Sequence, residues 1–102
     1  MKFGLSEETI QKIQSVFSKF PEIEKAILYG SRAKGNFKSG SDIDLSLEGK
    51  NLNHDLLTSI ASELDDLLLP YTVDLSIYTS LHHQELEEHI RRVGVLFYAL
   101  KN

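Results

Sequence analysis

Two carboxylates spaced two residues apart follow a turn of small residues in the first half of the chain. Residues 30–45 read GSRAKGNFKSGSDIDL and contain Asp42 and Asp44. Residues i and i+2 of a strand point to the same face, about 6.5 to 7 Å apart at Cα, so both side chains can converge on a cation. A Gly-Ser turn can bring backbone N–H groups against phosphate oxygens. The combination indicates metal-assisted phosphoryl chemistry.

A third acidic residue, Asp74, lies in a later segment of alternating apolar and polar residues. We expect all three aspartates to bind Mg²⁺, because this ion accepts carboxylate together with substrate phosphate oxygens. Asp74 is also expected to accept the proton of an attacking hydroxyl. The residues expected to contact the nucleotide are Gly30, Ser31, Arg32, Lys34 and Ser41, with Lys38 as a further positive charge.

Each of these residues also has an ordinary structural interpretation. An isolated Asp-x-Asp pair is usually a solvated polar face, and a lone Gly30 is usually a turn residue. Arg32 and Lys34 could equally be solvated basic side chains, and Ser41 could be a polar loop end. The chemical interpretation is favoured because the turn, the carboxylate pair and the later Asp74 occur together.

The histidines and the apolar C-terminal segment are expected to serve other purposes. His82, His83 and His89 have no neighbouring cysteine, so we expect surface or interface positions rather than a zinc site. Residues 93–100 are apolar around more of a helical circumference than one buried face requires. This segment is either a well-buried final helix or, with Tyr71 or Phe37, a surface that docks a helical protein or a second copy.

Composition limits the classes of protein that the chain can represent. Its 102 residues, 41% of them hydrophobic, suffice for one packed core, so we expect a single domain over residues 1–102. With 11 basic and 15 acidic residues, the net charge is 11 − 15 = −4, which argues against a long nucleic-acid partner. Cysteine is absent, which excludes disulfides and thiolate metal sites. No segment has the length or apolarity of a signal peptide or membrane span, so we expect a cytoplasmic protein.

Periodicity predicts an α/β (α+β) domain around a small mixed sheet, with helices packed on one face. Alternation predicts that the three aspartates project from the other, polar face. The expected helices run from residue 6 up to Pro21 and over 56–68 and 86–100, with a short one over 31–34. The expected strands cover residues 23–29, 42–47 and 73–78.

The turn and the carboxylates together resemble the nucleotidyltransferase signature of the polymerase-beta superfamily. The resemblance rests on Gly-Ser-Arg-Ala-Lys-Gly, a short loop, Ser-Asp-Ile-Asp-Leu and an aspartate on a later strand. Element order and length are similar to those of the minimal nucleotidyltransferases (MNT), small prokaryotic proteins usually encoded beside a helical HEPN partner. The resemblance implies a polymerase-beta-like fold in which Gly30 and Ser31 hold a nucleoside triphosphate and Asp42, Asp44 and Asp74 bind Mg²⁺.

Members of the MNT family are commonly antitoxins that neutralise a HEPN ribonuclease by transferring AMP to one of its tyrosines. The resemblance therefore implies ATP as substrate and a HEPN-type partner. Larger relatives that modify aminoglycosides carry an extra domain, for which 102 residues leave no room, so a protein acceptor is favoured. Two alternatives stay open: a non-catalytic module that neutralises its partner by binding alone, and a small-molecule nucleotidyltransferase completed by an oligomeric partner.

Overall fold

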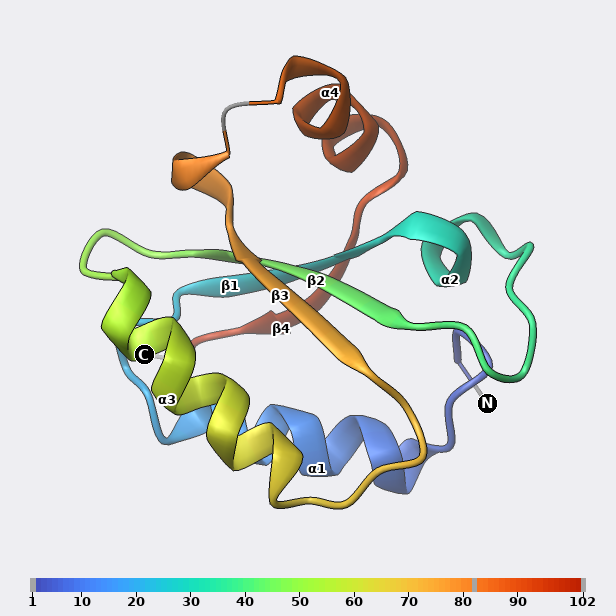
Figure 1. Cartoon of the computed structure of the whole chain (residues 1–102), viewed down its shortest axis with the longest axis horizontal. Coiled ribbons are helices and arrows are strands. Elements are labelled where there is room, and N and C mark those ends of the chain that lie inside the picture. Colours follow the sequence, from blue (N-terminus) through green and yellow to red (C-terminus); the bar gives the residue numbers. More distant parts are fainter. Residues whose placement is uncertain (1, 82, 102) are drawn as a thin grey trace.

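The computed structural model describes residues 2–81 and 83–101, which form a four-stranded sheet with helices on both faces (Figure 1). The helices are α1 (Glu7–Ser18), α2 (Gly30–Lys34), α3 (His54–Asp65) and α4 (Gln84–Val93), and a 3-10 turn, η1 (Tyr78–Ser80), precedes α4. The strands are β1 (Lys25–Tyr29), β2 (Ile43–Glu48), β3 (Val73–Ile77) and β4 (Val95–Ala99). No helix within this described part is long and apolar enough to cross a membrane.

The sheet is mixed, as predicted, with the strand order β3-β2-β1-β4. β1 pairs antiparallel with both β2 and β4, whereas β2 and β3 are parallel. The parallel register places Asp44 directly beside Asp74. The two acidic segments are therefore brought together by strand pairing, as alternation alone suggested.

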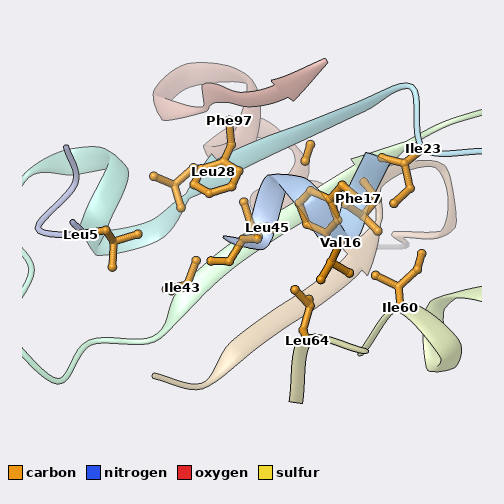
Figure 2. Packing of buried hydrophobic residues seen from close by; sticks show 13 residues of the cluster. Leu5, Val16, Phe17, Ile23, Leu28, Ile43, Leu45, Ile60, Leu64 and Phe97 are labelled. Carbon is orange, nitrogen blue, oxygen red and sulfur yellow. The ribbon is translucent and has the colours of Figure 1, made fainter. Parts of the chain in front are cut away.

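One face of the sheet is apolar and is covered by α1 and α3 (Figure 1). Phe17 of α1 is fully buried, and its ring meets Phe97 and Tyr98 of β4 edge to face, with centroid separations of 6.5 and 5.6 Å. Edge-to-face contacts of this kind add to the stabilisation from burial. Figure 2 shows the side chains of this cluster gathered between the strands and the two helices. Its members include Leu5, Ile13, Val16, Ile23, Leu28, Ile43, Leu45, Leu47, Ile60 and Leu64.

Side chains at the N-termini of three helices explain where these helices begin. The Ser6 hydroxyl accepts a hydrogen bond from the Thr9 N–H, and the Asn53 side chain accepts one from the Leu56 N–H. His83 plays the same part for α4, because its Nδ1 accepts from the Leu86 N–H at 3.1 Å. These bonds satisfy backbone donors that a helix leaves free in its first turn. His83 therefore has a structural role, whereas His82 lies outside the described residues.

The prediction of one continuous helix over residues 86–100 is wrong. Helix α4 ends at Val93, and the chain continues as β4, which adds a fourth strand beside β1. Gly94 marks the change, because a Cβ at this position would collide with the Ile90 carbonyl oxygen and lie 2.6 Å from Ile27 Cγ2. The residues that follow are β-branched or aromatic at several positions, which favours a strand. Residues 93–100 are apolar without interruption, so the sequence pattern did not indicate the end of α4 at Val93.

Helix α4 also lies on a different face from the one predicted. The contact of Gly94 with Ile27 and that of His89 with Gly30 place α4 beside β1 on the polar face, opposite α1 and α3 (Figure 1). Ile90 supplies the buried position of α4. The polar face is therefore partly covered, and α4 lies next to the predicted site.

Candidate functional site

The turn after β1 brings backbone against a carboxylate. Gly30 opens α2 with φ +74°, a left-handed conformation that glycine adopts readily. A Cβ at this position would collide with Asp44 Oδ2. The absence of a side chain thus permits both the sharp turn and the close approach of Asp44 to the turn.

The three predicted aspartates come from two adjoining strands. Asp44 is half-buried on β2 beside Asp74 on β3, and Asp42 immediately precedes β2. Burial raises the pKa of the Asp44 carboxyl, and the neighbouring Asp74 and Asp42 raise it further, whereas Arg32 acts in the opposite direction. The ionised form of Asp44 is therefore disfavoured, which is the situation that a bound cation would relieve.

The carboxylates do not form a ready-made metal centre in this conformation. Among residues 2–81 and 83–101, no three Asp, Glu or His side chains gather closely enough to hold an ion by themselves. Mg²⁺ is commonly bound by one or two carboxylates together with substrate phosphates and water, so a complete protein cage is not required. Asp44, crowded by Asp42 and Asp74, fits such a partial donor set.

Arg32 occupies a different position from the one expected of a nucleotide ligand. Its side chain is only 2% exposed, and its guanidinium lies between the rings of Phe37 and Tyr71, 5.3 and 4.9 Å from their centroids. It donates hydrogen bonds to the Ser41 carbonyl from Nε at 3.1 Å and from Nη2 at 2.8 Å, and to the Phe3 carbonyl from Nη1 at 2.8 Å. Arg32 therefore anchors the loop that leads into Asp42, and does not face a triphosphate.

The aromatic residues around Arg32 pack partly against its side chain. Phe37 and Tyr71, expected as possible partners of an external protein, are both half-buried against the guanidinium. Ser41 closes the same loop, since its Oγ accepts from the Lys38 N–H at 2.8 Å. Lys34, in contrast, is exposed at the end of α2.

The comparison with known families agrees with this geometry. Residues 11–102 match the family model described as "Polymerase beta, Nucleotidyltransferase". The chain belongs to this family. No match to a curated protein was found for this nucleotidyltransferase.

Solved structures with the same fold include antitoxin complexes. The nucleotidyltransferase superposes with a TM-score of 0.70 on a chain of a toxin–antitoxin crystal structure with AMP-PNP, at 23% identity over 95% of this chain and 76% of that chain. A chain of the MntA–HepT toxin–antitoxin structure gives 0.68 at 20% identity, covering 93% of this chain and 74% of that one. The complex of an MNT antitoxin with a tri-AMPylated HEPN toxin of Shewanella oneidensis gives 0.68 at 19% identity, covering 94% and 74%. At this level of identity the likeness establishes the fold.

Two residues beside the turn of this nucleotidyltransferase were missed by sequence reasoning. The Gly30 N–H donates to Nε2 of His89 at 3.1 Å, across 59 positions in the sequence. The Tyr29 ring meets the His89 ring edge to face, with centroids 6.1 Å apart. Burial raises the pKa of the Tyr29 hydroxyl; Asp74 and Asp44 add to the shift, and the Ser76 hydroxyl opposes it. No local sequence pattern signals either contact, because His89 is distant in sequence from Tyr29 and Gly30. The expected position of α4 on the opposite face also excluded these contacts.

Two serines lie two residues beyond Asp44 and Asp74 on their strands, on the same face of the sheet. Ser46 on β2 pairs in register with Ser76 on β3, and Ser46 is fully buried. The hydroxyl oxygen of Ser46 has no hydrogen-bond partner within the described part of the chain. The polar face of the nucleotidyltransferase thus retains a buried hydroxyl that its own side chains do not satisfy.

A groove in the described part of the chain lies away from the predicted site. A groove of about 830 Å³ runs between α1 and β4, and its lining includes Gln14, Leu96 and Tyr98 but none of the predicted site residues. The predicted site, in contrast, lies on the polar face of the sheet, where Asp44 approaches Gly30 and pairs in register with Asp74.

Proposed function

We propose that this protein transfers AMP from ATP to a hydroxyl group of a helical HEPN-type protein and thereby acts as its antitoxin. The observation that carries the proposal is the placement of Asp44 against both Gly30 and Asp74. This placement puts a turn suited to phosphate beside carboxylates suited to a divalent cation. The fold shared with structures of an AMP-PNP complex and of an AMPylated HEPN toxin supports the choice of nucleotide and partner.

In the proposed reaction, the acceptor oxygen forms a bond to the α-phosphorus of ATP, and the bond to pyrophosphate breaks. Asp42 and Asp44 would hold Mg²⁺, and the ion would offset the negative charge of the phosphates. Asp74 takes the proton that the acceptor hydroxyl loses, for which an exposed carboxylate is suited. Gly30 and Ser31 orient the triphosphate, and Lys34 adds positive charge beside it.

Arg32 contributes to this reaction indirectly, by holding the loop before Asp42 in place. Its hydrogen bonds to the Ser41 carbonyl hold the residue directly before Asp42. We therefore assign Arg32 a positioning role, which replaces its expected contact with the nucleotide.

The test is the intact mass of the HEPN-type partner after incubation with this protein, ATP and Mg²⁺. We expect the wild type to add one or more AMP units and the double variant Asp42→Ala, Asp44→Ala to add none. Asp66→Ala serves as the matched control, because Asp66 is an exposed aspartate at the end of α3, on the other face of the sheet. Absence of any mass gain on either protein with wild type would contradict the proposal.

A second candidate function is neutralisation by binding alone, favoured by the apolar edge strand β4. Val95 and Leu96 are 36% and 57% exposed on this strand, where a stable complex would cover them. The same double variant separates the two functions. If it neutralises the toxin as well as wild type, binding suffices; if it still binds but no longer neutralises, group transfer is required.

A further inference from the structure

The hydrogen bond between His89 of α4 and Gly30 of the turn after β1 has a defined direction. The Gly30 backbone N–H is the donor and His89 Nε2 is the acceptor, at 3.1 Å, in a half-buried setting. An imidazole nitrogen can accept only when it carries no proton, so this bond selects the neutral ring with its hydrogen on Nδ1. The Gly30 N–H is thus already satisfied by the protein, so in the proposed site Gly30 contributes by allowing the backbone to approach the phosphates closely, and not by donating this N–H.

The imidazole is held in place by its surroundings. Its ring contacts the Tyr29 ring at an interplanar angle of 82°. The next residue, Ile90, is the buried position of α4, and Gly94 at the end of the helix lies against Ile27 of β1. His83 fixes the start of the same helix through its bond to the Leu86 N–H. The C-terminal half of α4 therefore packs against β1, and His89 is the residue through which it contacts the turn.

Gly30 contacts a different part of the site on its other side. Its Cα hydrogens face the Asp44 carboxylate, where any side chain would collide. A shift of Gly30 away from α4 would therefore change the distance between the turn and the carboxylate expected to hold the metal. The bond to His89 opposes such a shift, because releasing it leaves a half-buried N–H without an acceptor.

We propose that His89 is a positioning residue for nucleotide binding, which holds the Gly30 N–H through Nε2 and so keeps the phosphate-binding turn in place against Asp44. This role rests on the proposed function, because it is defined by the nucleotide that the turn receives. It assigns to α4 a task beyond covering the sheet.

The test uses two substitutions of His89, one that keeps an aromatic ring and one that keeps a hydrogen-bond acceptor. His89→Phe keeps an aromatic ring beside Tyr29 but has no acceptor atom, whereas His89→Gln supplies an acceptor oxygen without the ring. We expect His89→Phe to weaken AMP-PNP binding with Mg²⁺ about tenfold, as loss of one acceptor for a half-buried N–H implies. His89→Gln should recover most of that loss. Amide hydrogen exchange at Gly30 should follow the same order, fastest in His89→Phe.

A merely structural role for His89 would give a different pattern. Affinity for AMP-PNP would then follow thermal stability across the variants, without rescue by His89→Gln, and this result would overturn the proposal. Wild-type affinity and wild-type Gly30 exchange in His89→Phe would also overturn it, while AMP transfer by the wild type would leave the proposed function intact. If the wild type bound no nucleotide, the proposed function and the role of His89 would both fall.

The proposal can also be tested where a variant does not fold. The ¹⁵N chemical shifts of the His89 ring in the wild-type protein distinguish a protonated Nε2 from an unprotonated one. We expect the unprotonated form at Nε2 in the folded protein. A proton on Nε2 of the neutral ring would contradict the hydrogen bond and overturn the proposal.

Discussion

Helices α1 and α3 cover one face of the sheet and α4 lies on the other (Figure 1). The first face is packed with apolar side chains, whereas the second carries carboxylates and hydroxyls. The apolar face has its stabilising groups fully buried, as Phe17 illustrates. The polar face contains Asp44, whose ionised form is disfavoured, and the hydroxyl of Ser46, which has no partner within the described residues. The main stabilising contacts and the proposed chemistry thus lie on opposite faces, so we expect the effects of substitutions on stability to differ in sign as well as size between the two faces.

The largest expected loss of stability comes from the apolar face. Phe17→Ala removes a fully buried ring that contacts Phe97 and Tyr98. We expect the free energy of unfolding to fall by about 3 to 5 kcal/mol, because the substitution loses buried area and leaves a cavity. Urea unfolding measures this loss. The control Phe17→Leu keeps most of the volume and should lose clearly less; equal losses would show that ring volume does not determine stability on this face.

A smaller loss is expected where the backbone of the polar face meets Asp44. Gly30→Ala and Gly35→Ala both place a side chain at positive φ, +74° and +87°, but only the Cβ at position 30 meets other atoms. We expect about 1 kcal/mol of destabilisation for Gly35→Ala from backbone strain alone, and about 2 to 3 kcal/mol for Gly30→Ala.

These two glycine variants should differ even more in nucleotide binding. Gly30→Ala displaces the Asp44 carboxylate, whereas Gly35→Ala leaves the space around it unchanged. AMP-PNP titration with Mg²⁺ should show lost binding for the first and near wild-type binding for the second. Equal behaviour of the two variants would mean that contact with Asp44 has no part in the site.

The smallest expected effect on the free energy of unfolding is a gain in stability and not a loss. At neutral pH, Asp44→Asn removes a half-buried negative charge that Asp74 and Asp42 repel, so we expect a gain in stability of up to about 1 kcal/mol after screening by solvent. The same variant should lose AMP transfer. The exposed Asp66→Asn is the control and should leave both properties near those of wild type.

The pH dependence of this gain follows from the raised pKa of Asp44. A carboxyl whose pKa is raised in the folded state lowers the stability of the protein as the pH rises from the ordinary pKa of 3.8 through the raised pKa. The difference between Asp44→Asn and wild type should therefore be full at neutral pH and fade as the pH falls through that window. Unfolding measured over a pH series tests this, and a gain that stayed constant down to low pH would contradict it.

The parts of the fold that local pattern determines were predictable from the sequence. Alternation around Asp44 and Asp74 predicted two strands with their carboxylates on one face, and the parallel register of β2 and β3 confirms that these residues are neighbours. Helical spacing around Phe17 predicted α1 and its buried side. These features depend on residues that are close in sequence, where side-chain period is informative.

The parts that depend on distant contacts were not predictable. Residues 95–99 form a strand because they pair with β1, whereas their apolar run alone fits either a helix or a strand. Arg32 is buried because Phe37 and Tyr71 flank it and carbonyls from two other segments accept its hydrogen bonds. His89 reaches Gly30 only because α4 lies on the polar face. In each case at least one deciding partner lies far away in the chain, such as Phe3 and Tyr71 for Arg32.

The hydrogen bond from Arg32 to the Phe3 carbonyl bears on where this domain begins. The family match starts at residue 11, yet Phe3 shares one guanidinium with the loop that precedes Asp42, and Leu5 is fully buried in the core. A shortened protein that started with α1 would retain every helix and strand of the sheet. It would nevertheless remove one acceptor of the Arg32 guanidinium, so we expect the residues before α1 to help hold the loop that precedes Asp42.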